Sequence, residues 1–209
     1  MKILLYGGTF DPPHYGHIHN VMSVAATVKP DLVIVMPAGV PPHKAASHTP
    51  AELRLAMCAC FSELAGTPDI PKLTVSRWEI DAAVCGRANY TVTTLDMLHD
   101  ANPDAALYLA VGSDMLLTFD EWHEWQRVLK LACLVVESRE ADDLDALHKK
   151  AESLDPDATH ILFAHQPALP LSSTQIRQEI AAGQDCGTKL PQCVQEIIKK
   201  EKLYATHDS

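Results

Sequence analysis

Two histidines near the amino terminus, His14 and His17, have the residue type and spacing to contact phosphate. They are three positions apart, so in a helical first turn they share one face and can both reach one phosphoryl group. Imidazole N–H groups donate hydrogen bonds to phosphate oxygens. The alternatives are a zinc pair, for which no third ligand of suitable spacing is near, and a helix cap beside a surface histidine. The spacing alone therefore favours phosphate contact.

The segment before these histidines is a glycine-containing loop that follows a short apolar run. Gly7 and Gly8 let the backbone turn tightly and approach a ligand closely. The helix predicted from about Gly16 directs its N-terminal N–H groups into the same space. The loop matches neither G-x-G-x-x-G nor the P-loop pattern G-x-x-x-x-G-K-[ST]. It therefore predicts a different phosphate cradle, with histidines in place of lysine.

A second group of phosphate-binding candidates stands near the carboxyl end of the chain. Ser172, Ser173 and Thr174 place hydroxyls and N–H groups at a predicted helix start. Arg177 lies four residues after Ser173, on the same helical face, and its guanidinium can make a bidentate phosphate contact. Ser172 and Gln175 also fit a capping box, which does not exclude phosphate binding. Together these residues can hold a triphosphate opposite the first loop.

Further candidates are scattered between these two segments. Asp114 lies just beyond a predicted strand and can accept hydrogen bonds from ribose hydroxyls. Trp122 offers a flat face to a ring, whereas a core or surface position is favoured for Trp125. Lys44 and Arg139 can contact phosphates, although a solvated surface position is at least as common for such residues.

Short apolar runs alternate with stretches of helical spacing, which is typical of an α/β doubly wound, mainly parallel sheet. The predicted strands are Ile3–Tyr6, Leu32–Met36, Leu73–Ser76, Leu107–Val111, Cys133–Glu137 and His160–Ala164. The predicted helices are His17–Val28, Ala51–Leu64, Tyr90–His99, Glu121–Leu131, Asp142–Ser153, Ser173–Ala182 and Pro191–Glu201. Ligands of such folds bind beyond the carboxyl ends of the strands, where the strand order reverses. We therefore expect the chemistry in loops that follow strands.

The whole-chain properties predict one domain over residues 1–209, with a helical carboxyl-terminal part from about 171. The 209 residues carry a formal net charge of −10, which argues against nucleic-acid binding because that requires a basic face. No apolar stretch approaches the roughly 20 residues of a membrane span, and no signal peptide is recognisable. We therefore expect no membrane partner and a cytoplasmic location. The sequence leaves the oligomeric state open, a homo-oligomer included.

The six cysteines do not form a C-x-x-C pair and stand mostly in apolar stretches. This pattern favours reduced cysteines that pack as small hydrophobic residues, over zinc ligands or disulfides.

The stretch from Gly7 to His17 resembles the G-x-F-x-P-x-H-x-G-H signature of nucleotidyltransferases that transfer AMP or CMP from a nucleoside triphosphate to a phosphate. Other segments, in order and spacing, resemble the bacterial nicotinate mononucleotide adenylyltransferases over essentially the whole chain. These segments are Pro41-Pro42-His43-Lys44, Asn89-Tyr90-Thr91, Gly112-Ser113-Asp114, Leu116 to Phe119 with Trp122 and Trp125, and Leu171 to Arg177. Asn89 stands where Ser is common, and Glu140-Ala141 follow Arg139 in place of the usual Pro-Gly.

The resemblance implies a Rossmann-like nucleotidyltransferase that joins ATP to nicotinate mononucleotide in NAD biosynthesis. It implies catalytic roles for His14, His17 and Arg177. The implied ATP site comprises these three with Gly7, Gly8, Thr9, Phe10, Gly112, Asp114, Ser172, Ser173 and Thr174. The implied mononucleotide site comprises Lys44, Tyr90, Thr91, Trp122, His123 and Arg139, with a ring stack on Trp122. Main-chain N–H groups around Thr91 and the Trp122-His123 turn would bind the nicotinate carboxylate.

The expected cofactor is Mg²⁺ held mainly by the ATP phosphates and water, so we predict no metal-ligand residue. The alternatives are an adenylyltransferase for nicotinamide mononucleotide or for phosphopantetheine, and a catalytically silent nucleotide-binding module.

Overall fold

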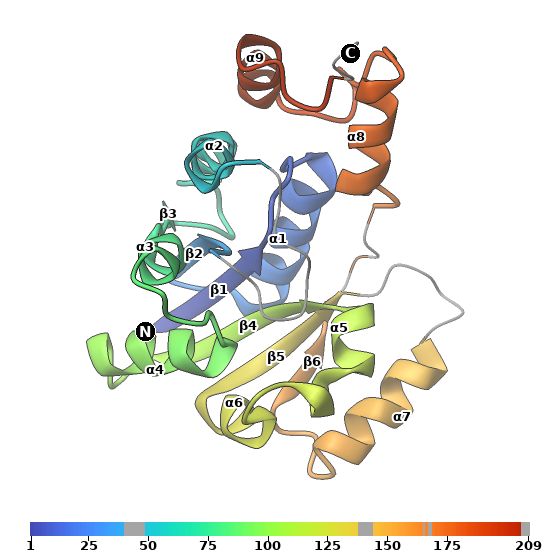
Figure 1. Cartoon of the computed structure of the whole chain (residues 1–209). Coiled ribbons are helices and arrows are strands. Elements are labelled where there is room, and N and C mark those ends of the chain that lie inside the picture. Colours follow the sequence, from blue (N-terminus) through green and yellow to red (C-terminus); the bar gives the residue numbers. More distant parts are fainter. Residues whose placement is uncertain (40–48, 138–143, 165, 167–168, 206–209) are drawn as a thin grey trace.

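A six-stranded parallel sheet forms the centre of the computed structural model, which describes residues 1–39, 49–137, 144–164, 166 and 169–205 (Figure 1). The strands are β1 (Lys2–Gly8), β2 (Leu32–Pro37), β3 (Leu73–Val75), β4 (Ala106–Gly112), β5 (Ala132–Glu137) and β6 (Ile161–Phe163). Their order in the sheet is β3-β2-β1-β4-β5-β6, and every neighbouring pair is parallel. The order reverses at β1, between β2 and β4. The predicted doubly wound parallel fold is confirmed.

Helices cover both faces of this sheet. The α-helices are α1 (Tyr15–Val28), α2 (Ala51–Met57), α3 (Trp78–Val84), α4 (Thr91–Ala101), α5 (Ser113–Leu117), α6 (Trp125–Leu131), α7 (Leu144–Leu154), α8 (Ser173–Ala181) and α9 (Gln192–Lys200). Two 3₁₀ segments are η1 (Cys58–Leu64) and η2 (Phe119–Glu121). In the described ranges no helix is long and apolar enough to cross a bilayer.

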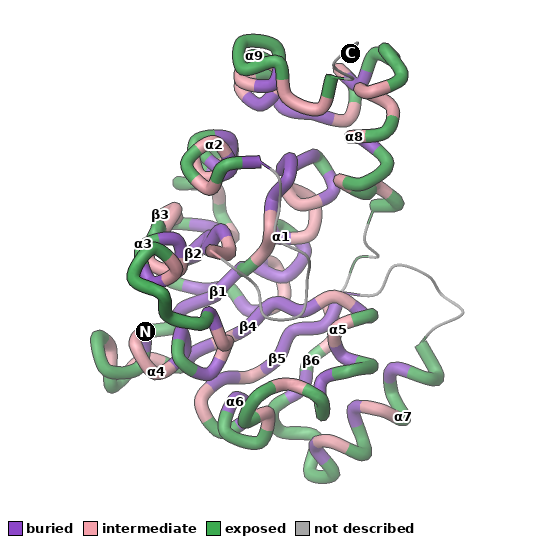
Figure 2. Tube along the Cα trace, viewed as in Figure 1, coloured by how far each residue is buried: buried purple, intermediate pink, exposed green. Residues whose placement is uncertain are grey.

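Alternating side chains of the central strands feed two apolar clusters, one on each face of the sheet. Leu4 and Tyr6 of β1 pack with α1, η1, α8 and α9, whereas Ile3 and Leu5 pack with α4, α5, α6 and α7. Figure 2 shows the central strands buried along most of their length and the outer sides of the helices exposed. Burial on both faces explains why β1, β2, β4 and β5 are continuous apolar runs. The same burial fixes the position of the carboxyl ends of β1 and β4, where the candidate site lies.

The helices agree less closely with the sequence pattern than the strands do. All six predicted strands are present within two residues of their predicted ends. The predicted helix Ala51–Leu64 is instead α2 followed by η1, and α6 begins four residues later than predicted, after η2. The pattern missed α3 and α5, which are only 7 and 5 residues long.

Candidate active site

Two cavities open at the carboxyl ends of β1 and β4, the place where the strand order reverses. The larger has a volume of about 730 Å³ and is lined by the β1–α1 loop and the start of α8, among others. The smaller, of about 380 Å³, is lined by the start of α4 and the segment 118–123. They share Gly7, Gly8, Thr9, Ala110, Asp114 and Met115. Ligands in the two cavities would therefore meet along the loop that follows β1.

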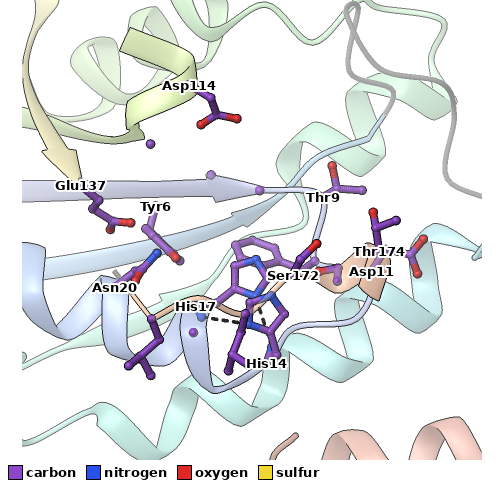
Figure 3. Close-up of a pocket in the computed structure, with 18 of the residues that line it drawn as sticks. Tyr6, Thr9, Asp11, His14, His17, Asn20, Asp114, Glu137, Ser172 and Thr174 are labelled. Atoms are coloured by element: carbon purple, nitrogen blue, oxygen red, sulfur yellow. Dashed lines mark hydrogen bonds between the residues drawn. The ribbon is translucent and has the colours of Figure 1, made fainter. Parts of the chain in front are cut away.

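His14 and His17 lie at the start of α1 and bond reciprocally to each other's main chain (Figure 3). The His17 N–H donates to Nδ1 of His14 at 3.3 Å, and the His14 N–H donates to Nδ1 of His17 at 3.2 Å. Their rings stack with centroids 3.8 Å apart. A neutral imidazole that accepts at Nδ1 carries its proton on Nε2. Both rings line the larger cavity, so the helix cap and the predicted phosphate contact are compatible.

Phe10 packs behind the histidine pair. It lines the larger cavity, yet the residue is only 1% exposed, and its ring lies 5.1 Å from the His17 ring, centroid to centroid. Tyr6 and Phe61 contact the Phe10 ring from the core. The predicted ATP-site residue Phe10 thus holds the His17 ring in place through packing.

The start of α8 is bonded directly to the β1–α1 loop. Nη1 of Arg177 donates to the Asp11 carbonyl at 2.7 Å, and the Ser173 hydroxyl donates to the Pro12 carbonyl at 2.9 Å. Nη2 of Arg177 donates to the Thr174 hydroxyl at 3.2 Å. The larger cavity is lined by Asp11, Ser172, Ser173, Thr174 and Arg177 of this group. The two predicted phosphate-binding segments, far apart in the sequence, therefore build one wall.

The capping box that Ser172 and Gln175 could form is not present at the start of α8. Ser172 is the N-cap residue of α8 but makes no side-chain cap hydrogen bond. The Gln175 amide instead donates to Glu179 at 3.1 Å, one turn further along the helix. The Gln175 side chain thus points along α8 rather than back toward its first N–H groups.

Asp114, at the start of α5, lines both cavities and is exposed. A Cβ atom on the neighbouring Gly112 would come within 2.7 Å of Oδ1 of Asp114, so the glycine leaves room for this carboxylate. A carboxylate at the junction can accept hydrogen bonds from the ribose hydroxyls of a nucleotide. This position agrees with the sugar contact predicted for Asp114.

The smaller cavity brings together the described residues of the predicted mononucleotide site. Tyr90, Thr91, Trp122 and His123 all line it. The rings of Tyr90 and His123 are 4.3 Å apart, and Trp122 packs on Phe119 at 5.1 Å, centroid to centroid. The main-chain N–H of Trp122, predicted as a donor to the nicotinate carboxylate, instead donates to the Phe119 carbonyl at 3.0 Å within the turn. Lys44 and Arg139 lie outside the described residues.

A carboxyl group that the sequence analysis did not anticipate lines the smaller cavity. Glu79, on α3, accepts a hydrogen bond from the fully buried Thr94 hydroxyl at 2.8 Å. Burial raises the pKa of Glu79 to about 7, which the Thr94 hydrogen bond only partly offsets. At neutral pH this carboxyl is therefore partly protonated. The main-chain carbonyl of Glu79 accepts a hydrogen bond from the side-chain amide of Asn89 at 3.0 Å, which connects α3 to the segment before α4.

Several further residues of the larger cavity were also missed, namely Tyr6, Asp11, Asn20, Glu137 and Tyr204. Figure 3 shows Tyr6, Asn20 and Glu137 gathered on one side of the histidines. Two signals could have found members of this group. Glu137 is a polar residue at the end of an apolar strand, and Asn20 follows His17 by one helical turn. Tyr204 has no such local signal, because only the folded chain brings it to the site.

A protein metal centre is not evident in the described ranges, and most of the thiols there are poor nucleophiles. No three His, Cys, Asp or Glu side chains of those ranges gather closely enough to hold a metal ion. All six cysteines are free, and Cys85 is exposed. Burial raises the thiol pKa of the other five, that of Cys60 to about 12. Such a thiol stays protonated and is a poor nucleophile.

Comparison with known proteins supports a family assignment. The family model described as Cytidylyltransferase-like matches residues 5–179. A protein of Acidithiobacillus ferrooxidans named probable nicotinate-nucleotide adenylyltransferase is 36% identical, over 97% of this chain and 95% of its own length. A protein of the same name from Roseiflexus sp. is 38% identical over 96% of each chain. The chain belongs to the nicotinate-nucleotide adenylyltransferase family. The resemblance drawn from the sequence motifs is confirmed.

Solved structures share the fold of this nicotinate-nucleotide adenylyltransferase family member. The nicotinic acid mononucleotide adenylyltransferase of Plasmodium falciparum, complexed with NaAD, superimposes with a TM-score of 0.77 over 97% of both chains, at 18% identity. A putative nicotinate-nucleotide adenylyltransferase from Vibrio parahaemolyticus gives a TM-score of 0.67 at 19% identity, over 99% of this chain and 98% of its own. The same overall fold thus recurs in both.

Proposed function

We propose that this protein transfers AMP from ATP to nicotinate mononucleotide, giving nicotinate adenine dinucleotide and pyrophosphate. Full-length relatives at 36% and 38% identity carry the name of this activity. The observation that carries the proposal is the pair of cavities that meet along Gly7–Thr9 and Asp114. A larger and a smaller nucleotide that bind there would have their phosphates at one shared wall.

The reaction is a direct displacement at the α-phosphorus of ATP. A 5′-phosphate oxygen of the mononucleotide attacks the α-phosphorus, and the bond to the β-phosphate oxygen breaks to release pyrophosphate. The attacking oxygen is already anionic, so no general base is needed, and catalysis rests on positioning and charge stabilisation. Nε2–H groups of His14 and His17 donate to the phosphate oxygens as negative charge shifts to the leaving group. Arg177 adds a permanent positive charge at the same wall.

We propose that Mg²⁺ enters with ATP, held by triphosphate oxygens and water. The lining fits this arrangement, because its acidic side chains Asp11, Asp114 and Glu137 do not gather, among the described residues, into a cluster of three metal ligands. Bound there, the ion would offset part of the negative charge of the phosphates.

The position of Glu79 in the smaller cavity makes nicotinamide mononucleotide a second candidate acceptor substrate. An ionised carboxylate in the smaller cavity would repel the nicotinate carboxylate, whereas it could accept a hydrogen bond from an amide. A protonated Glu79 would instead donate to the nicotinate carboxylate. Because its pKa is about 7, both forms are populated near neutral pH.

The decisive assay measures pyrophosphate release by the purified protein with ATP and Mg²⁺. Nicotinate mononucleotide, nicotinamide mononucleotide and 4′-phosphopantetheine are compared at equal concentrations. We expect at least a tenfold preference for the nicotinate substrate, which is about 1.4 kcal/mol of transition-state discrimination. Equal rates with the amide would leave the phosphate chemistry intact and remove the carboxylate selectivity. Absence of turnover with all three would favour a nucleotide-binding module.

A further inference from the structure

The carboxyl-terminal segment that follows α9 reaches the larger cavity. Tyr204 lines this cavity together with Asp11, Thr49 and Arg177. The Leu203 N–H donates to the Ile198 carbonyl at 3.0 Å, which anchors the segment to the end of α9. A residue close to the end of the chain therefore stands in the wall formed by the β1–α1 loop.

The Tyr204 hydroxyl bonds directly to that loop. It donates to Oδ1 of Asp11 at 2.6 Å and accepts from the Thr49 hydroxyl at 3.5 Å. Asp11 is only 7% exposed, so this hydrogen bond is shielded from water. Burial and the neighbouring Asp11 raise the pKa of Tyr204 above its usual range, so the hydroxyl keeps its proton and remains a donor.

Tyr204 and the residue that precedes Asp11 have a backbone conformation that non-glycine residues rarely adopt. Tyr204 has φ 63°, and Phe10, the residue before Asp11, has φ 51°. Such conformations cost free energy and persist where surrounding contacts hold them. The hydroxyl contact between the two segments is one of these contacts.

Other bonds hold the same short stretch of the loop. Arg54, 3% exposed on α2, donates from Nη1 to the Thr9 carbonyl at 2.9 Å. Arg177 and Ser173 of α8 hold the carbonyls of Asp11 and Pro12. Tyr204 differs from these because it holds the Asp11 side chain rather than the main chain. The loop between β1 and the histidines is thus fixed from α2, from α8 and from the carboxyl-terminal segment.

We propose that Tyr204 is a positioning residue for adenylyl transfer. Through Asp11 it fixes the β1–α1 loop, and with it His14 and His17, in the arrangement that binds the triphosphate. This inference rests on the proposed function for its kinetic consequence. The order of the β1–α1 loop and the affinity for an ATP analogue test the role of Tyr204 whatever the acceptor substrate is.

The first test replaces Tyr204 with Phe, which removes the hydroxyl and keeps the ring. Tyr108→Phe is the matched control, because Tyr108 is a partly buried tyrosine of β4 that pairs with Leu4 and Cys133, away from both cavities. Calorimetry with an α,β-methylene analogue of ATP measures affinity. Hydrogen exchange of peptides that cover residues 7–17 measures loop order. We expect Y204F to weaken analogue binding about tenfold and to speed exchange in the loop, as loss of a hydrogen bond to a charged group predicts.

Steady-state kinetics then separate positioning from general destabilisation. We expect kcat/KM for ATP to fall while KM for nicotinate mononucleotide stays within twofold. Both Y204F and Y108F should remain folded at the assay temperature, so that the loss does not reflect unfolded protein. Unchanged analogue affinity and exchange in Y204F would overturn the proposal. An equal loss of affinity for both substrates would assign Tyr204 a structural role and overturn it as well.

A second test asks whether the hydroxyl acts through Asp11. Asp11→Ala is compared alone and combined with Y204F. We expect the double variant to bind the analogue as Asp11→Ala does, because the contact is already lost. Additive losses would show that Tyr204 acts without Asp11, contrary to the proposal. If the unmodified protein adenylylates none of the acceptors, the proposed function fails, yet analogue binding and loop exchange still decide the role of Tyr204.

Discussion

His14 and His17 each use one ring for the helix cap, and the proposed phosphate contact would use the same ring. Nδ1 satisfies a main-chain N–H at the start of α1, and this use fixes the proton on Nε2. A lysine in the same place would offer charge but could not accept the N–H bond of the helix start. The spacing of the two histidines predicts the shared face correctly. The spacing does not distinguish a cap from a phosphate contact, because one geometry is compatible with both.

Replacing His17 with Ala should reduce turnover far more than stability. Loss of one transition-state donor is expected to lower kcat by about 10² to 10³, whereas loss of the cap costs about 1 kcal/mol of folding free energy. Steady-state kinetics and thermal melting measure the two effects. The control is His99→Ala, an exposed histidine in the last turn of α4. A loss of activity that merely follows the loss of folded protein would contradict a role in transfer.

Glu79 should make stability depend on pH. Its native pKa is about 7 and its unfolded value is 4.5, so between these values the native state holds a proton that the unfolded chain has released. The resulting stabilisation is complete below pH 4.5 and is lost as the pH rises through 7, by up to about 3 kcal/mol. Urea unfolding at pH 5 and pH 8 measures it.

The Glu79→Gln variant should lose most of this pH dependence, because the amide does not titrate and can still accept the Thr94 hydrogen bond. Glu152→Gln, at an exposed position of α7, should behave as the parent protein. An unaltered pH dependence in Glu79→Gln would show that another group titrates.

At the scale of elements, the start of α1 depends on close contact. A Cβ atom on Gly16 would lie 2.8 Å from Nδ1 of His14 and 3.2 Å from Cβ of Leu171. A Cβ atom on Gly7, by contrast, would meet nothing within 4 Å, and Gly7 lines both cavities. One glycine thus admits a neighbouring ring, and the other leaves space for a ligand.

Alanine at these two glycines should therefore have opposite effects. Gly16→Ala should displace His14, break the cap and lower both activity and stability. The stability loss should be about 1 kcal/mol, because the better helix propensity of Ala partly offsets it. Gly7→Ala should melt at or above the parent temperature but bind substrates more weakly. Melting curves and KM values for both substrates test this pair, and a Gly7→Ala variant with parental KM values would contradict it.

The elements also show how far the sequence pattern extends. Strands buried on both faces produce apolar runs that are visible in the sequence, so β1, β4 and β5 were found near their true ends. The seven-residue α3 and five-residue α5 span too few turns for a helical period to emerge. The segment 51–64 has helical spacing throughout, yet it continues as η1, which packs against α9 and β3. Tertiary packing decided that change, and no local signal predicts it.

At the scale of the whole molecule, the site joins parts that are distant in the sequence. Motifs found the β1–α1 loop, the end of β4 and the start of α8, because each combines special residue types within a few positions. Tyr204, Arg54 and Glu79 were missed because each is a single ordinary residue in its own segment. Their contacts exist only once the sheet has brought α2, α3 and the carboxyl-terminal segment to the same edge.

ATP should stabilise this whole assembly in a single transition. The larger cavity is lined by β1, β4, β5, α1, α8 and the carboxyl-terminal segment, so a ligand there contacts both the sheet and the helical end. At about 100 times Kd, ATP should add about 2.7 kcal/mol of stability. For this chain length that corresponds to roughly 5 to 10 °C in melting temperature. Arg177→Ala should show a much smaller shift, and an equal shift would place ATP elsewhere.

The wall shared by the two cavities has a consequence for what happens after the new bond forms. A dinucleotide product that spans both cavities would keep the contacts of both halves, while only one molecule loses its freedom of motion. Pyrophosphate, in contrast, keeps only the phosphate contacts. We therefore expect the dinucleotide to be the tighter ligand of the two products and to leave last, so that its release limits turnover.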